Sequence, residues 1–184
     1  MIHEIVTYGQ EVLRHKAQPV PAITKEIKTL AQDLLDSMYA ARGVGLAAEQ
    51  IGREEAICVI DVPAESENPA VVKDNAAIRM PLILVNPVIT ATAGQQRNDE
   101  GCLSFPDISA PITRPMQVTV TYLDLNGKPQ TATAQGLLAR AILHETDHLT
   151  GVLLVDRMSA IQRLAVAGKL KRLQAEARPI DRQP

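Results

Sequence analysis

The chain has very few aromatic residues: it contains no tryptophan, one phenylalanine and three tyrosines among 184 residues. It therefore lacks the aromatic platforms on which nucleic-acid bases stack. A formal net charge of −2 also argues against a general nucleic-acid-binding surface. Leucine, isoleucine, valine and alanine must build the core, and the length suits a single domain over residues 1–184.

Long apolar runs are missing as well. No run approaches the roughly 18 apolar residues that a membrane-spanning helix needs, and residues 1–4 lack the pattern of a signal peptide. The only cysteines are Cys58 and Cys102. Cytosolic thiols stay reduced, so a disulfide between these two is not expected. These absences predict a cytoplasmic protein with no membrane partner.

Hydrophobic periodicity predicts both helices and strands. The expected helices cover residues 24–42, 136–150 and 159–177. The expected strands cover residues 55–62, 81–92, 116–125 and 131–134, with a hairpin turn at 126–127. The apolar side expected for the last helix consists of Ile161, Leu164, Leu170 and Leu173. The predicted fold class is α+β, with antiparallel or mixed sheets packed around the helix at 136–150 and with a C-terminal helix.

The sequence HETDH at residues 144–148 is an HExxH motif. Residues four apart lie on one face of an α-helix, so His144 and His148 can hold one metal ion. Glu145 projects beside that ion and can exchange a proton with water that the ion activates. A polar helix end is the ordinary alternative, but the preceding residues 136–143 read as helical, which the motif requires.

A catalytic metal centre usually has three protein ligands and one open position. The longer HExxHxxGxxH pattern of metzincin proteases fails here, because Leu154 stands where the third histidine would be. Cys58 lies in an apolar, strand-like run, which favours core packing. Cys102 lies in a polar segment next to a glycine. Chemistry alone leaves Cys102 as either a ligand or an ordinary thiol.

Two further segments complete a set of three motifs. GVGLAAEQ occupies residues 43–50 and EGCLS occupies residues 100–104, ahead of HETDH at 144–148. A helix C-cap would explain Gly43 by itself. Together, the three segments resemble the signatures GφGφAAxQ, EGCLS and HExDH of the peptide deformylase family, where φ is apolar, in the same order. The likeness extends over nearly the whole chain.

The resemblance implies a hydrolase that removes the formyl group from the N-terminal formyl-methionine of new polypeptides and releases formate. The residues that would hold the ion are Cys102, His144 and His148. Glu145 would act as general base and then as general acid. The Gln50 amide and the Leu103 backbone N–H would donate to the oxyanion, and Gly45 would let the backbone approach the substrate. The resemblance also implies Fe²⁺ as the ion, with Ni²⁺, Co²⁺ or Zn²⁺ as substitutes.

The positions that match the family's pocket for the methionine side chain are Val44, Leu137, Arg140 and Ala141. Arg140 is expected to line the wall with its methylene stem and to keep its charge in water. Ordinary helix packing is an equal alternative for Leu137 and Ala141. Three residues depart from common family patterns: Leu143 in place of glutamine, Ser109 in place of arginine and Asn98 in place of an apolar residue. An exposed loop is expected at 63–77, where it could shape access to the site.

Two other functions compete with this interpretation. A zinc peptidase that cleaves internal bonds shares HExxH but lacks an explanation for the motif at 43–50. A non-catalytic metal-binding protein would be expected to have lost Glu145 or Gln50, and both are present. The C-terminal helix carries a basic excess, made up of Arg163, Lys169, Lys171, Arg172 and Arg178. A solvated helix face explains this excess, and the resemblance implies a ribosome contact there. A monomer is expected.

Overall fold

The computed structural model describes residues 1–177, so Arg178 lies outside the described residues. Five strands form one antiparallel sheet in the order β1-β2-β3-β6-β7. They are β1 (Gly45–Ala47), β2 (Ile57–Ile60), β3 (Leu82–Ala93), β6 (Gln117–Leu123) and β7 (Pro129–Gln135). Two further strands, β4 (Gln96–Gly101) and β5 (Ser109–Arg114), form a separate antiparallel hairpin. The predicted α+β class is confirmed.

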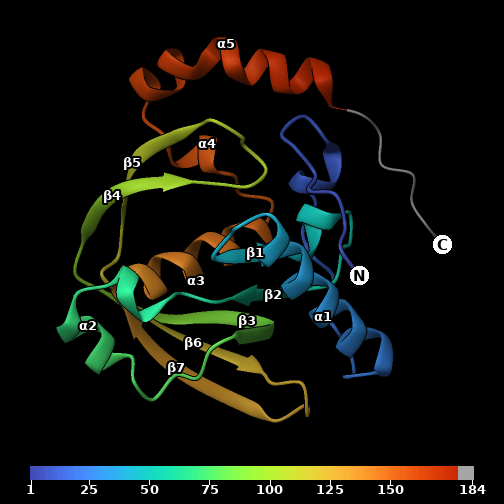
Figure 1. Ribbon diagram of the computed structural model, residues 1–184, viewed down its shortest axis with the longest axis vertical. Helices are drawn as coiled ribbons and strands as arrows, with labels where there is room; N and C mark the ends of the chain where they lie inside the picture. Colours follow the sequence, from blue (N-terminus) through green and yellow to red (C-terminus); the bar gives the residue numbers. More distant parts are fainter. Residues whose placement is uncertain (178–184) are drawn as a thin grey trace.

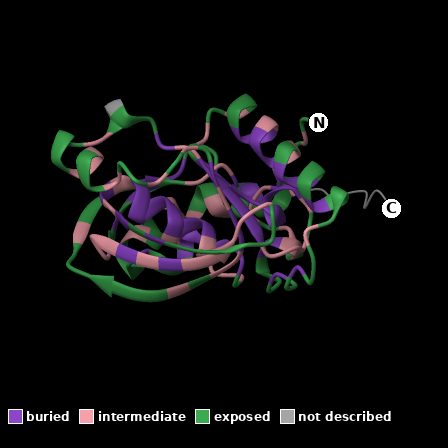
Figure 2. Cartoon of the chain, turned by 90° about the horizontal axis from the view of Figure 1, so that it is seen from below, coloured by how far each residue is buried: buried purple, intermediate pink, exposed green. Residues whose placement is uncertain are grey.

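The helix α3 (Gly136–His148) lies between the five-stranded sheet and the β4–β5 hairpin (Figure 1). The helix α1 (Lys25–Ala40) flanks the sheet, and α5 (Ala160–Glu176) crosses over the hairpin on the far side from α3. The remaining short elements are η1 (Glu11–Arg14), η2 (Ala48–Ile51), η3 (Ala64–Ser66), α2 (Pro69–Asp74) and α4 (Leu154–Arg157). Figure 2 shows the buried residues concentrated in α3 and in the layers that enclose it.

Local sequence explains α1 well. Thr24 caps its N-terminus by accepting a hydrogen bond from the Ile27 N–H at 3.4 Å. The apolar residues recur at helical spacing and are buried against the sheet: Ile27, Leu30, Leu34 and Met38. The helix ends just before Arg42, which has a φ of 57°. This termination leads the chain directly into the GVGLAAEQ segment.

The prediction of a simple exposed loop at 63–77 is wrong, because this segment contains η3 and α2. This segment covers the N-terminus of α3. The Glu67 carboxylate accepts from the Leu137 N–H, and the Asn75 side-chain amide exchanges two hydrogen bonds with the Gln135 backbone. Gly136 has a φ of 63°, and a Cβ there would overlap the Glu67 carboxylate, so this start of α3 requires glycine.

The C-terminal helix is present as predicted, but its apolar side is only partly correct. Leu173 is buried and Leu170 packs against the same cluster. Ile161 and Leu164, in contrast, are 81% and 77% exposed. Gln162, between them, bonds the Pro111 carbonyl of β5, so the helix meets the hairpin at this turn and these two apolar side chains lie on its outer side. Among the described residues, no helix is both long and apolar enough to cross a bilayer.

Candidate active site

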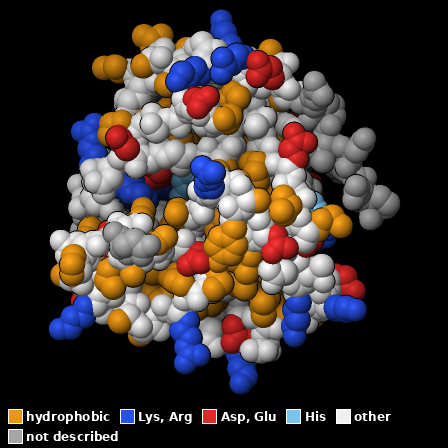
Figure 3. Space-filling model, viewed as in Figure 1, with side chains coloured by type: hydrophobic (Ala, Val, Ile, Leu, Met, Phe, Trp, Pro, Cys, Tyr) orange, Lys and Arg blue, Asp and Glu red, His pale blue; other side chains and the backbone are white. Residues whose placement is uncertain are grey.

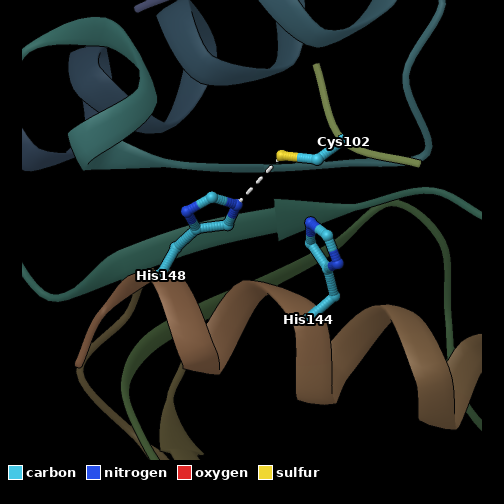
Figure 4. A group of neighbouring side chains, drawn as sticks. All are labelled: Cys102, His144 and His148. Carbon is cyan, nitrogen blue, oxygen red and sulfur yellow. Dashed lines mark hydrogen bonds between the residues drawn. The ribbon is translucent and has the colours of Figure 1, made fainter. Parts of the chain in front are cut away.

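The three predicted metal ligands come together. His144 and His148 project from one face of α3, and Cys102 approaches them from the turn after β4 (Figure 4). The Cys102 Sγ lies 3.3 Å from the His148 Nε2, and one ligand atom from each of the three residues lies within 4.8 Å of the others. Donors bound tetrahedrally at about 2.0–2.3 Å from one ion stand roughly 3.5 Å apart. One thiol and two imidazoles therefore fit a divalent transition metal here with little movement.

Glu100 orients the first histidine. Its Oε1 lies 2.7 Å from the His144 Nδ1. A proton on Nδ1 leaves Nε2 as the free ligand atom, which is the arrangement that metal-binding histidines generally have. Burial by itself would raise the pKa of Glu100, but hydrogen bonds from Arg114 and His144 outweigh it and hold this pKa well below its usual range. Glu100 is thus a fixed carboxylate.

This carboxylate is part of a buried charge network that sequence reasoning missed. Arg114 donates to Glu100 at 2.6 and 2.9 Å, and also to Asp147 at 2.8 Å. Arg157 donates to the same Asp147 at 2.9 Å. The network ties β5 and the segment after α3 to the metal helix. The sequence held one indication that Arg114 is buried. It follows Ala110 and Ile112 at alternate positions of β5, and all three side chains lie on the buried face of that strand.

Glu145 lies beside β1, where the first motif meets the third. A Cβ on Gly45 would overlap the Glu145 carboxylate, so the glycine makes room for this side chain. Gly45 had been expected to make room for the substrate, and the structure shows this additional reason for it. Burial raises the pKa of Glu145 to about 7. Its Oε2 has no hydrogen-bond partner within residues 1–177, which leaves that oxygen available to a ligand.

Gln50 faces the metal ligands with its nitrogen. Its Oε1 accepts from the Ala47 N–H at 2.9 Å, which sets the orientation of the amide. The Nε2 then lies 3.6 Å from the Cys102 Sγ and 3.2 Å from the Ser104 Oγ. Leu103 follows Cys102 directly, and its side chain packs closely against Gly43. Both predicted oxyanion donors therefore belong to segments that adjoin the ligands.

The four residues expected in the methionine pocket differ in how far they are exposed. Val44 is 40% exposed, Leu137 is half-buried and Ala141 is buried. The expectation that Arg140 keeps its charge in water is wrong: its side chain is only 4% exposed, and its guanidinium bonds the Glu100 carboxylate at 2.7 Å. Charge pairing with Glu100 explains why an arginine is tolerated at a buried position. Figure 3 shows histidine atoms within a hollow on this face of the molecule.

The three departures from family patterns leave this set intact. Leu143 packs against the core cluster of the sheet and α3. Ser109 is exposed at the start of β5, opposite Gly101. Asn98 has an exposed side chain on β4, while its carbonyl accepts from Arg140 at 3.4 Å. Leu154, which replaces the third histidine of metzincins, is buried in the core under α5. Cys102, not residue 154, lies beside the two histidines.

Next to Gln50, Glu49 is fully buried, and neither of its carboxylate oxygens has a hydrogen-bond partner within the described chain. Burial raises the pKa of Glu49 to about 8. In the unfolded chain, Glu49 ionises near the ordinary pKa of 4.5. Between pH 4.5 and pH 8, the Glu49 carboxyl is therefore protonated in the folded state and ionised in the unfolded state. The contribution of this protonated carboxyl to the free energy of unfolding is therefore complete below pH 4.5 and is lost as pH rises toward 8.

We predict that Glu49→Gln removes this loss. Between pH 5 and 8, the free energy of unfolding of the wild type should fall relative to the variant by about 1.4 kcal/mol per pH unit. Urea unfolding of both proteins at matched metal content would measure the difference. Glu4→Gln, an exposed change of the same kind, is the control and should leave the slope unaltered. Parallel pH profiles for wild type and Glu49→Gln would contradict the prediction.

Comparisons with known proteins agree with this geometry. Residues 2–164 match the sequence profile described as polypeptide deformylase. A peptide deformylase of Synechococcus sp. is 45% identical over 92% of this chain and 79% of its own length. That of Nitrosococcus oceani is 42% identical over 94% of this chain and 96% of its own length.

Solved structures show the same relationship. The crystal structure of a peptide deformylase from Legionella pneumophila superposes with a TM-score of 0.81 at 40% identity, covering 97% of this chain and 100% of that one. A peptide deformylase from Synechococcus elongatus in complex with actinonin superposes with a TM-score of 0.80 at 39% identity, covering 97% and 92%. With its three motifs gathered at one metal-binding site, this chain belongs to the polypeptide deformylase family.

Proposed function

We propose that this chain is a metal-dependent peptide deformylase in which residues 1–184 act as one catalytic domain. It removes the formyl group from the N-terminal formyl-methionine of new polypeptides and releases formate. One observation carries the assignment of its site: Cys102, His144 and His148 converge, with Glu145 and the Gln50 amide beside them. We further propose that the protein acts as a monomer in the cytoplasm.

In this mechanism, Glu145 transfers protons, and Gln50 and Leu103 stabilise the developing negative charge. When bound, a divalent ion makes water a nucleophile at neutral pH and polarises the formyl oxygen. Glu145 accepts the proton of the attacking water and then donates it to the departing amine. Gln50 and the Leu103 N–H donate to the formyl oxygen as negative charge develops there. One such donor lowers the barrier by about 2.7–4 kcal/mol.

The substrate's methionine side chain is proposed to lie along Val44, Leu137, Arg140 and Ala141. Leu137 and Ala141 occupy the same side of α3 as His144, because they precede it by seven and three residues. The half-buried Leu137 and partly exposed Val44 can lose further area to a bound side chain. Removal of that apolar area from water contributes to binding.

Ferrous iron is proposed as the native ion, on the resemblance of the ligand set. The geometry of one sulfur and two nitrogen donors also suits zinc, which binds such sites at least as tightly. Purification without oxygen, followed by metal analysis and activity per bound metal, decides between these ions. More formate per iron than per zinc supports iron, and a higher rate with zinc contradicts it.

The reaction itself is tested by comparing three substrates. Formyl-Met-Ala-Ser should release formate, whereas acetyl-Met-Ala-Ser and casein should stay intact. The acetylated peptide is the matched control, because it differs only at the acyl group. Cleavage of casein in place of deformylation would favour the zinc peptidase, and no hydrolysis of any substrate by metal-loaded protein would favour a non-catalytic metal-binding protein.

We also propose that α5 contacts ribosomal RNA near the exit of the nascent chain. Arg163, Lys169, Lys171 and Arg172 are exposed, and only Glu176 offsets them on this helix. Contacts between these cations and phosphates would weaken steeply with salt. A solvated helix face is the alternative.

Reversal of the charges of Lys169, Lys171 and Arg172 to glutamate should abolish cosedimentation with ribosomes at low salt. The buried Leu173 and the catalytic site remain, so formate release from short peptides should be normal. The same charge change on other helices, made at Lys25, Lys28 and Lys73, is the control and should leave cosedimentation intact. Wild-type cosedimentation of the α5 variant would show that the helix is only a solvated face.

A further inference from the structure

Arg42 ends α1 in a conformation that arginine rarely adopts. Its φ is 57°, which lies in the left-handed region. The Arg42 N–H donates to the Tyr39 carbonyl at 3.0 Å, and the Gly43 N–H donates to the carbonyl of residue 38 at 2.9 Å. These two hydrogen bonds form a Schellman motif, in which the residue at the position of Arg42 is usually glycine because glycine has no Cβ. A strained arginine there indicates that its side chain has a use beyond ending the helix.

The position of Arg42 in the chain places it at the rim of the active site. The next residue, Gly43, packs closely against the Leu103 side chain, and Leu103 directly follows Cys102. Arg42 itself is exposed. Figure 3 shows a Lys or Arg side chain directly beside the hollow in which histidine atoms are visible. Arg42 is therefore a solvent-exposed cation one residue away from the segment that borders the metal ligands.

The charge of Arg42 is not used by the described part of the chain. Within residues 1–177, the arginines that form ion pairs are Arg14, Arg53, Arg114, Arg140, Arg157 and Arg172. Asp61 lies near Arg42, because its N–H donates to the Val44 carbonyl at 2.9 Å. The Asp61 carboxylate, however, accepts from the Tyr39 hydroxyl. Arg42 is thus available to pair with an anionic group of a bound molecule.

The proposed binding mode of the substrate leads its chain toward Arg42. Gly45 lies beside Glu145, where the formyl group reacts, and the preceding Val44 is the proposed contact of the methionine side chain. The peptide beyond methionine then continues in the direction of Gly43 and Arg42. An extended peptide advances about 3.3 Å per residue, as a strand does, so the second residue lies beside Gly43 and the third beside Arg42.

We propose that Arg42 forms an ion pair with an acidic side chain at the third position of the substrate and so favours new polypeptides that carry aspartate or glutamate there. This inference rests on the proposed deformylase function. The pair forms in solvent, so its contribution to binding is modest and decreases with salt. An arginine that served only to offset the dipole at the C-terminus of α1 would leave substrates with different third residues equal.

The test compares kcat/KM for formyl-Met-Ala-Asp-Ala, formyl-Met-Ala-Asn-Ala and formyl-Met-Ala-Lys-Ala. Each peptide has an amidated C-terminus, so that no terminal carboxylate competes for Arg42. The wild type should prefer aspartate to asparagine by about 3-fold, as expected for one exposed ion pair, and should disfavour lysine. Both preferences should vanish in about 1 M salt, because the screening length is then about 3 Å.

Two variants and one control complete the test. Arg42→Gly should treat the three peptides alike, since glycine adopts the same φ without strain, and Arg42→Glu should prefer the lysine peptide. Lys28→Gln removes one exposed cation at the opposite end of α1 and should keep the wild-type preferences. Each ratio is measured within one protein preparation, so the fraction of metal-loaded protein cancels.

Equal kcat/KM values for the aspartate and asparagine peptides in the wild type would overturn the inference, whatever the variants do. An unchanged preference for aspartate in Arg42→Gly would also overturn it. Both of these results leave deformylation itself intact, whereas the absence of formate from all three peptides would refute the proposed function.

Discussion

Glu145→Gln should keep the metal and lose nearly all turnover. The side chain is not one of the three proposed ligands, yet it follows His144 directly and lies beside β1. One of its carboxylate oxygens has no hydrogen-bond partner among residues 1–177. A glutamine has almost the same shape and would still fit against Gly45. It cannot accept the proton of the attacking water or return it to the amine. Proton transfer by a placed side chain contributes about 10²–10⁴-fold, so kcat should fall at least 100-fold.

The measurement combines metal analysis with formate release from formyl-Met-Ala-Ser. Thr146→Ser is a suitable control on the same helix, because the Thr146 hydroxyl donates to the α3 carbonyls of Ile142 and Leu143 and serine can keep these bonds. This control should retain near-normal kcat. A Glu145→Gln protein that is fully metal-loaded and close to wild type in kcat would refute the role given to Glu145.

Cys102→Ala should lose tight metal binding, whereas Cys58→Ala should keep it. The Cys102 Sγ faces the His148 Nε2 at 3.3 Å, so its removal leaves two ligands. Cys58 is fully buried in β2, and burial raises the pKa of its thiol well above the usual value. A protonated core thiol does not bind metal, so the alanine there costs stability only. This makes Cys58→Ala a matched control for the loss of one thiol.

Metal content after dialysis against a weak chelator separates the two variants. Thiol labelling gives a second readout, since a reagent should modify Cys102 faster in the metal-free protein than in the metal-loaded one. Cys58 should react slowly in both, because its side chain has no exposed area. A Cys102→Ala protein that keeps one ion per chain would contradict the proposed ligand set.

Short-range patterns predicted the elements and ligands that depend on neighbouring residues. The spacing of His144 and His148 determines their common face once the helix forms. The cap at Thr24 and the apolar repeat of α1 likewise act within one helix. The resemblance supplied Cys102 and Gln50, and the structure brings both to the same place.

Long-range pairing determined what the sequence did not reveal. The β4–β5 hairpin was missed, and with it the buried face that carries Arg114. The sequence did not show that Glu100 pairs with Arg140, so Arg140 was predicted to keep its charge at the surface, because an unpaired charge is not stable in a core. Ile161 and Leu164 lie on the outer side of α5. Helix geometry alone could have shown this for Leu164, which is about two and a half turns from the buried Leu173. The hairpin and the pairing of Arg140 could not be read from residues adjacent in the chain.

Stepwise metal loading of the metal-free protein tests the central claim most directly. Fe²⁺ is added without oxygen, and formate release from formyl-Met-Ala-Ser is measured at each ratio of iron to protein. We predict that the rate rises linearly and reaches its plateau at one ion per chain, and that Cys102→Ala shows no such titration. Formate release that is independent of added metal, or a fully loaded protein that releases no formate, would contradict the account.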